Sequence, residues 1–523
     1  MSQRSHILAH DLGTTGNKAT LFDAETGVAV ASLFEPYKTS YPHPNWAEQN
    51  PFDWQHAIYE GTRRLVDRAA ISPSAVAAVS FSGMMNGALP VDADGEPLRP
   101  AILWADQRAT AEAQFLADAY GAEQVYRCTG SRPGAAYTAA KLLWIKRHQP
   151  EVYARTSQIL QSKDYAAFLL AGVFATDYSD ASNTNLFDLE RRAWASDLIH
   201  ATGLEEDKLP PIYPSTAVIG RVTPRAAART GLLAGTPVVI GGGDGACATV
   251  GAGSVLPGDA YTHIGSSAWI AVTADRPVYD PQMRTFTLAH LDPRLYMPLG
   301  SMQCAGGSFD WLEGLLRGEG DARLYDDLGA AAAVTPPGAG GLLFLPHLMG
   351  ERSPYWNPLA RGAFVGLSMA HGRPEMTRAV LEGVAFNLCS ILNALGAKRS
   401  GTAAMRLIGG AARGPTWRQI LANVLGLPIL LPALPAQATS LGAAIAGGVG
   451  VGLYSGFDVA YKLVRVAEAE RPDPASQASY AEIYPLFLET YLALEPIFGA
   501  LAGWTSKGGP ASQTEESPPW PRS

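Results

Sequence analysis

The sequence predicts two α/β domains, each built on a mixed β-sheet with flanking helices. The chain has 523 residues, which is too long for a single hydrophobic core. Residues 6–11, 18–23 and 28–34 read as strands joined by tight turns, and this pattern predicts an antiparallel meander. A similar strand–turn–strand pattern recurs at residues 260–273, so we expect the two domains to be duplicates of each other.

Helical and strand patterns alternate after the first meander. Residues 53–70, 109–120 and 139–148 have helical periodicity, whereas residues 75–82 form an apolar strand. Because strands and helices alternate along the chain, we expect helices to pack against a mixed sheet.

The domain boundary is placed near residue 252, before the second strand-rich block. This gives domains of residues 1–252 and 253–504. The tail, residues 505–523, is rich in Pro, Ser and Gly and is expected to be disordered.

Composition and charge argue against several classes of protein. The chain is 47% hydrophobic and 17% charged, as folded proteins are, and its net charge is only −8. No run of Lys or Arg favours nucleic acid or an anionic membrane as a partner. The four cysteines form no CxxC or Cys/His cluster, which predicts a reduced cytoplasmic protein. The uncharged stretch 419–457 is broken by Pro and Gly, so we expect a strand, a loop and a small-residue helix rather than a membrane span.

A turn of glycine and hydroxyl residues follows the first strand, and its members are Gly13, Thr14 and Thr15. Backbone N–H groups and hydroxyls in such a turn can surround a phosphate. Asp11 at the end of the strand could hold Mg²⁺, and Lys18 could add a positive charge. A plain hairpin in which Asp11 accepts turn hydrogen bonds explains the same residues. A second turn with the same chemistry comprises Gly265, Ser266 and Ser267.

Asp244 lies in the run Gly-Gly-Gly-Asp-Gly-Ala after an apolar strand, where a ligand could approach the backbone closely. Its carboxylate is a candidate general base for an attacking hydroxyl. Gly241 and Gly243 partly fit a dinucleotide-binding fingerprint, with Asp259 near the expected distance, but an anionic Asp244 would repel a pyrophosphate. A helix N-cap is the other interpretation of Asp244.

Residues 407–412 form another strand that runs into a glycine turn, before a predicted helix at 415–425. Small residues there would let an adenine or ribose lie against the backbone, or would simply let the helix pack closely on the strand. The motif GxxxxGK[ST] is absent, so phosphoryl transfer would need another scaffold.

These motifs, in this order, resemble the FGGY family of carbohydrate kinases and, within it, the xylulokinases. The likeness extends from about residue 7 to residue 454. Residues 137–148, with Lys141 and Trp144, resemble the N-terminal signature of the family, and residues 362–382 are similar to its C-terminal signature.

The resemblance implies two actin-like, ribonuclease H-like ATPase domains with ATP and a sugar in the cleft between them. It implies phosphorylation of a small ketose, best D-xylulose to D-xylulose 5-phosphate, with Asp244 as general base, Mg²⁺ near Asp11, and a homodimer. The implied nucleotide site comprises Gly13, Thr14, Thr15, Lys18, Gly265, Ser266, Ser267, Gly306, Gly307, Gly409, Gly410, Ala411 and Gly414. The implied sugar site comprises Met85, Asn86, Gly87, Trp104, Asp106, Asp244 and Gly245.

The sequence departs from the xylulokinase pattern where a sugar would bind. Asn86 stands where those enzymes have His, and Gly245 and Ala105 stand where they have Asn. Each change removes or alters a hydrogen-bonding group, so another pentulose or a polyol is an alternative acceptor. An actin-type ATPase without a sugar and a non-catalytic sugar sensor are the other classes. His10, beside Asp11, is expected to be a hydrogen-bonded core residue.

Overall fold

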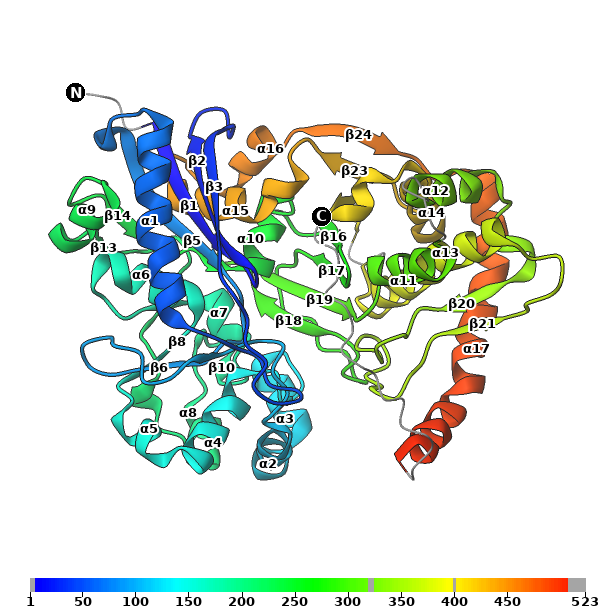
Figure 1. Cartoon of the computed structure of the whole chain (residues 1–523), viewed down its shortest axis with the longest axis horizontal. Helices are drawn as coiled ribbons and strands as arrows, with labels where there is room; N and C mark the ends of the chain where they lie inside the picture. Colours follow the sequence, from blue (N-terminus) through cyan, green and yellow to red (C-terminus); the bar gives the residue numbers. More distant parts are fainter. Residues whose placement is uncertain (1–4, 318–323, 398–400, 507–523) are drawn as a thin grey trace.

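The computed structural model describes residues 5–317, 324–397 and 401–506, which form two seven-stranded sheets with helices around them (Figure 1). The first sheet has the order β13-β14-β5-β1-β2-β3, with β15 pairing with the end of β5. Its strands are β1 (His6–Leu12), β2 (Gly16–Asp23), β3 (Ala29–Pro36), β5 (Val76–Gly83), β13 (Val218–Arg221), β14 (Pro237–Val239) and β15 (Gly242–Gly243).

The second sheet has the order β18-β19-β17-β16-β22-β23-β24. Its strands are β16 (Ala260–Ile264), β17 (Ala268–Val272), β18 (Phe286–Ala289), β19 (Tyr296–Met302), β22 (Met405–Ile408), β23 (Ile429–Pro432) and β24 (Val466–Glu470). In the first sheet three antiparallel strands (β3, β2 and β1) are followed by two parallel strands (β5 and β14) and an antiparallel edge strand, β13. The second sheet repeats this order with one more antiparallel strand: β18, β19, β17 and β16 are followed by the parallel strands β22 and β23 and the antiparallel edge strand β24. The predicted meander and the predicted duplication are therefore confirmed.

Helices of the first half cover its sheet and build a lower layer of short elements (Figure 1). α1 (Pro51–Ala69) starts where the Asn50 side chain accepts from the N–H of Phe52 and Pro51 begins the first turn. The other helices are α2 (Thr110–Tyr120), α3 (Ala122–Thr129), α4 (Thr138–His148), α5 (Pro150–Arg155), α6 (Ser162–Ala171), α7 (Tyr178–Ser182), α8 (Ser196–Thr202), α9 (Pro224–Thr230) and α10 (Asp244–Gly251). The short strands are β4 (Glu48–Gln49), β6 (Leu89–Val91), β7 (Ala101–Ile102), β8 (Gln158–Leu160), β9 (Thr176–Asp177), β10 (Phe187–Asp188), β11 (Ala193–Trp194) and β12 (Ile212–Tyr213).

The second half adds a two-stranded sheet and the remaining helices. The strands of that sheet are β20 (Leu343–Leu345) and β21 (Ala363–Val365). The helices are α11 (Gly306–Leu316), α12 (Leu324–Val334), α13 (Arg373–Ala394), α14 (Pro415–Leu425), α15 (Ala438–Gly450), α16 (Ala460–Leu463) and α17 (Pro474–Ser506). The uncharged stretch 419–457 thus contains a strand and a helix of small residues, as predicted.

One hydrophobic core joins the two halves. α15 belongs to the second half of the sequence but packs against β1, β5 and α10 of the first. Its buried Leu441 and Ile445 share a cluster with Ile7 of β1 and Tyr261 of β16. The domain boundary near residue 252 stays a prediction, and the change from one sheet to the other falls between β15 and β16.

α17 was not predicted. It contributes Phe487 and Tyr491 to a buried cluster, whereas Leu486 and Leu492 on its other side are more than half exposed. It is also the one helix of the described residues that is long and apolar enough to cross a membrane, by length and composition alone. Residues 505 and 506, which we had assigned to the tail, are its last residues, and residues 507–523 lie outside the described part of the chain.

Candidate active site

Asp11 and Asp244 lie on opposite sides of one strand end. Asp11 is the register partner of Ser82 on the parallel strand β5, and Gly242 of β15 pairs with the same Ser82 from the other side. Neighbouring strands are about 4.8 Å apart, so the backbone of Asp11 and the backbone leading into Asp244 are separated by about 10 Å. Two carboxylates therefore flank the carboxyl end of β5.

Asp244 begins α10 and is partly accessible to solvent. Burial, and secondly the charge of Asp11, raise the pKa of Asp244 to about 7, although it accepts a hydrogen bond of 2.7 Å from the N–H of Gly245. A carboxylate with a pKa near neutrality is a suitable proton acceptor for an alcohol. The N-cap of α10 is Gly243 and no side chain caps it, so the N-cap interpretation of Asp244 is wrong.

The surroundings of Asp11 suit a cation. Burial raises the pKa of Asp11, whereas the Ser82 hydroxyl and the charge of Lys18 lower it. The described residues hold no group of three or more His, Cys, Asp or Glu side chains that could bind a metal. A cation beside Asp11 would thus take most of its ligands from phosphate oxygens and water, which is the arrangement Mg²⁺ prefers. The carboxylate oxygens of Asp11 are thus suitable ligands for Mg²⁺.

The first glycine turn, residues 13–16, is held in shape by side chains that bond to its carbonyl groups. The Tyr37 hydroxyl donates to the carbonyl of Gly13 at 2.7 Å, and Gln49 Nε2 donates to the carbonyl of Thr14 at 2.7 Å. The carbonyl oxygens of Gly13 and Thr14 therefore accept hydrogen bonds from side chains of the protein itself. Lys18, on the strand after the turn, donates to the carbonyl of Ala436 in the second half at 2.7 Å.

The second glycine turn, residues 265–267, supports the start of α11. Gly306 N–H donates to the carbonyl of Gly265 at 2.8 Å, and Gly307 N–H donates to that of Ser266 at 3.0 Å. A Cβ atom on Gly306 would lie 2.4 Å from the Gly265 carbonyl oxygen, so only glycine permits this approach. The exposed Ser266 and Ser267 hydroxyls remain at the surface of the turn.

Gly409 brings the predicted adenosine segment to the same place. Its φ is +92°, and a Cβ atom there would lie 2.5 Å from the carbonyl oxygen of Ile264, the residue before the second glycine turn. A short 3-10 helix, Gly410–Arg413, follows and includes Ala411, and Gly414 is the N-cap of α14. All the second-half residues that were predicted to bind nucleotide are thus grouped around the ends of β16 and β22.

Two side chains tie the hairpin of the second glycine turn to the residue after Asp244, and a third bond within α10 reaches the same carbonyl. Tyr261 of β16 donates to the carbonyl of Gly245 at 3.0 Å, and Trp269 of β17 donates through Nε1 to the Tyr261 hydroxyl at 2.7 Å. The Thr249 hydroxyl donates to the same Gly245 carbonyl at 2.8 Å. The hairpin that carries the second glycine turn is therefore fixed to the helix that begins with the candidate base.

Lys141 anchors the loops that were predicted to contact sugar. Its side chain is fully buried, and Nζ donates to the carbonyls of Asn86 at 2.6 Å, Leu103 at 2.7 Å and Ala136 at 2.6 Å. Burial lowers the pKa of Lys141 to about 7. Because an ammonium group has three hydrogens, these bonds use its whole donor capacity and join three separate loops.

The turn at Met85, Asn86 and Gly87 lies beside Asp244. A Cβ on Gly243 would lie 2.6 Å from Met85 Sδ, which places this side chain against the residue before Asp244. Asn86 has a φ of +62°, and its buried Oδ1 has no hydrogen-bond partner among the described residues. The N–H of Gly87 donates to Gln161 Oε1 at 2.7 Å. Asn86 therefore offers an acceptor that a ligand hydroxyl could satisfy.

The carboxylate of Asp106 is paired with neighbouring groups of the protein. It is fully buried, Arg108 binds both its carboxylate oxygens at 2.9 and 2.7 Å, and the N–H of Ala47 donates to it at 2.6 Å. These contacts fix the loop that carries Asp106, and its contact with a sugar stays a prediction. Trp104 on that loop is 39% exposed and donates to the Thr14 hydroxyl at 3.1 Å, next to the first glycine turn.

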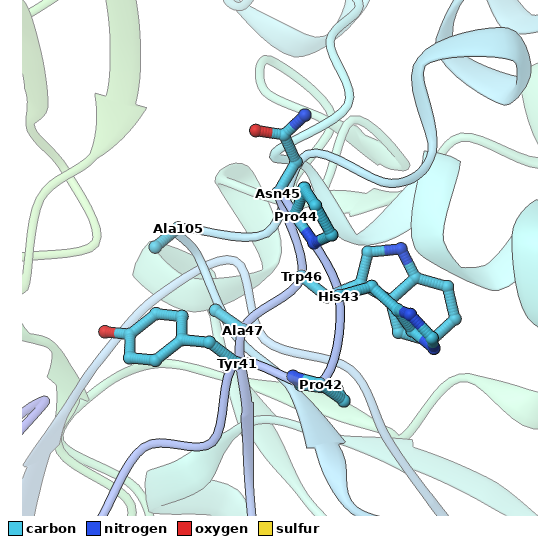
Figure 2. A pocket seen from close by; sticks show the side chains of 8 residues that line it. All are labelled: Tyr41, Pro42, His43, Pro44, Asn45, Trp46, Ala47 and Ala105. Carbon is cyan, nitrogen blue, oxygen red and sulfur yellow. The ribbon is translucent and has the colours of Figure 1, made fainter. Parts of the chain in front are cut away.

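A pocket of about 390 Å³ adjoins this loop (Figure 2). Its lining consists of Tyr41, Pro42, His43, Pro44, Asn45, Trp46, Ala47 and Ala105. Figure 2 shows the Tyr41 ring projecting on one side of the segment and the His43 and Trp46 rings on the other. Ala105, next to Trp104, is thus one of the lining residues of this pocket.

Sequence reasoning missed Asn183 and Ser179. Asn183 Nδ2 lies 3.8 Å from Met85 Sδ, and its buried Oδ1 has no hydrogen-bond partner among the described residues. Ser179 accepts from the N–H of Gly243 at 2.9 Å. Both come from a segment about 60 residues before Asp244, and no local pattern links them to it.

His10 is a buried core residue with hydrogen bonds to Asn17 and Thr62, as predicted.

Comparisons with known proteins cover both halves of the chain. The model for the FGGY family of carbohydrate kinases, N-terminal domain, matches residues 6–251, and the model for the C-terminal domain matches residues 260–451. A xylulose kinase of Escherichia coli is 33% identical over 487 residues, which cover 93% of this chain and 99% of the relative. A gluconokinase of Bacillus licheniformis is 31% identical over 508 residues, which cover 96% of this chain and 98% of the relative.

A solved structure also matches nearly the whole chain. The ligand-bound xylulose kinase from Lactobacillus acidophilus matches with a TM-score of 0.89 and 29% identity, over 95% of this chain and 99% of that one.

Proposed function

Because this chain belongs to the FGGY family of carbohydrate kinases, we propose that it transfers the γ-phosphoryl group of ATP to a small ketose, with Asp244 as the general base. The best candidate reaction converts D-xylulose to D-xylulose 5-phosphate. The observation that carries the proposal is the placement of Asp11 and Asp244 on either side of the end of β5, next to the turn at Asn86.

Each group of residues has a role in this proposal. The two glycine turns bind the phosphates of ATP through N–H groups and hydroxyls, and residues 409–414 bind the adenosine. Asp11 holds Mg²⁺, which supplies neutralisation of phosphate charge. Asn86 Oδ1 and Asn183 Oδ1 accept hydrogen bonds from sugar hydroxyls, which would satisfy both buried acceptors.

Asp244 accepts the proton of the attacking hydroxyl. Its raised pKa makes it a stronger base than an ordinary carboxylate, and the bond from the Gly245 N–H orients it. Phosphoryl transfer depends mainly on positioning and charge stabilisation, so a fixed base next to the acceptor is the principal requirement on this side of the site.

An aldonic acid such as gluconate is a second candidate acceptor. Arg132 of the first half stacks 5.5 Å from the ring of Trp356 in the second half, and the charges of Arg132 and Arg352 both act on Tyr137. Tyr137 follows Ala136, whose carbonyl Lys141 holds. Two guanidinium groups beside the sugar loops would favour a carboxylate over a neutral ketose. Other pentuloses and polyols stay alternatives.

Acceptor-dependent ADP release from ATP and Mg²⁺ tests the proposal. The acceptors are D-xylulose, other pentuloses, polyols and D-gluconate, each compared with the rate without acceptor. Asp244→Ala should lower kcat by about a hundred- to ten-thousand-fold while ATP still binds, because a positioned base contributes that much. Asp275→Asn, at an exposed carboxylate, serves as the control. If none of these acceptors raises ADP release, the proposed acceptors are wrong; if Asp244→Ala retains near wild-type kcat, Asp244 is not the base.

A further inference from the structure

We infer that Ser179 positions Asp244 by accepting the N–H of Gly243, so that Ser179 is a positioning residue for the reaction. The inference rests on the proposed role of Asp244 as the base. Ser179 is fully buried in α7 and bonds to the N–H of Gly243, so its contribution would be exerted through the backbone that leads into Asp244.

The Ser179 hydroxyl has two partners whose geometry fixes its direction. It donates to Asp177 Oδ2 at 2.6 Å and accepts from the N–H of Gly243 at 2.9 Å. A hydroxyl has one hydrogen, so its donation to the carboxylate aims a lone pair at Gly243. A Cβ atom on Gly242 would lie 2.7 Å from this hydroxyl, which shows how closely the strand before Asp244 rests on it.

Asp177 is itself held by a buried cation. Lys163 Nζ lies 3.0 Å from Asp177 Oδ1, 2.6 Å from Asp164 Oδ1 and 3.1 Å from Asp180 Oδ2, and all four side chains are buried. Charged groups that pair in the interior cannot move apart without a large cost in free energy, so Asp177 is a rigid support. Lys163 also lies under Gly83 at the end of β5, where a Cβ atom would be 2.9 Å from the Cβ of Lys163. One cluster therefore supports the strand ends on both sides of the candidate base.

Ser215 provides a matched control. Its hydroxyl donates to the same Asp177 Oδ2 at the same distance of 2.6 Å, and it is equally buried. It makes no hydrogen bond to Gly243. Ser179→Ala and Ser215→Ala each remove one donor to Asp177, but only Ser179→Ala leaves the Gly243 N–H without an acceptor.

The test is a double-mutant cycle on the full-length protein. Ser179→Ala should lower kcat by about ten-fold or more with both KM values within about three-fold, because an unpaired buried N–H costs enough to displace the base. Ser215→Ala should lose a similar amount of Tm but keep kcat within about two-fold. In an Asp244→Asn background, Ser179→Ala should change the residual rate by less than about two-fold, because a positioning residue acts only through its target.

The outcomes separate the two proposals. If Asp244→Asn loses most of its kcat and Ser179→Ala behaves as Ser215→Ala does, or reduces the residual rate of Asp244→Asn as much as it reduces that of the wild type, Ser179 has only a structural role. If Asp244→Asn itself keeps near wild-type kcat, the proposed base is wrong and the inference ends with it. Should Ser179→Ala not fold, Ser179→Cys keeps a weak acceptor of similar size and should show a smaller loss of kcat in the same cycle.

Discussion

Replacing Asp244 by asparagine should stabilise the free protein at alkaline pH. The native structure raises the pKa of this carboxyl from 3.8 to about 7, mainly by burial and secondly by the charge of Asp11. Each pKa unit corresponds to about 1.36 kcal/mol, so the ionised carboxylate destabilises the fold by at most about 4 kcal/mol. Because the side chain is partly accessible to water, we expect about 2 kcal/mol.

The pH dependence fixes the sign of this effect. A folded-state pKa above the unfolded-state value means that the native state favours the protonated form. The free energy of unfolding of the wild type therefore falls as pH rises from about 4 to about 7 and is level above that. Asparagine does not titrate, so the advantage of Asp244→Asn over the wild type should grow across this window.

Denaturant unfolding of both proteins at pH 5.5 and pH 8.5, without ATP or sugar, measures this difference. Asp275→Asn, at an exposed carboxylate, should show no such pH-dependent change. An Asp244→Asn protein that is less stable than the wild type at pH 8.5, or that differs from it equally at both pH values, would refute the reasoning. The folded protein would then not raise the pKa of Asp244.

Three further substitutions test the loops around the site. Lys141→Met should raise the KM for sugar about ten-fold or more with little change in the KM for ATP, since it frees three loops, whereas Lys146→Met on the same helix should change neither. Gly306→Ala should raise the KM for ATP about ten-fold, because the new methyl would lie 2.4 Å from a carbonyl oxygen of the second glycine turn, whereas Gly314→Ala in the same helix meets nothing within 4 Å and should be silent. Trp104→Phe removes the hydrogen bond to the first glycine turn and should raise KM for one or both substrates about three- to ten-fold. Steady-state kinetics with both substrates varied measures these KM values. The expectations would be contradicted if Lys146→Met changed KM as much as Lys141→Met, or if Gly314→Ala changed it as much as Gly306→Ala.

The sequence by itself determined the elements whose signals are local. The strand–turn–strand pattern at residues 260–273 corresponds to β16 and β17, and the helix predicted at 415–425 has the bounds of α14, because the apolar patterns there are bounded by glycine or proline. The two glycine turns and the run around Asp244 were predicted in the same way, because the residues of a turn at a strand end are adjacent in the sequence.

Only the tertiary structure decided how distant residues share a site. Asp106 has the sequence signal of a sugar contact, but Arg108 and the Ala47 N–H occupy its carboxylate once the loops are folded. Lys141 and Ser179 act on loops far away in the chain, and no periodicity or spacing encodes those hydrogen bonds. The position of α15 against the first sheet is of the same kind, because which face of a small-residue helix is buried depends on the surface that it meets rather than on its own pattern.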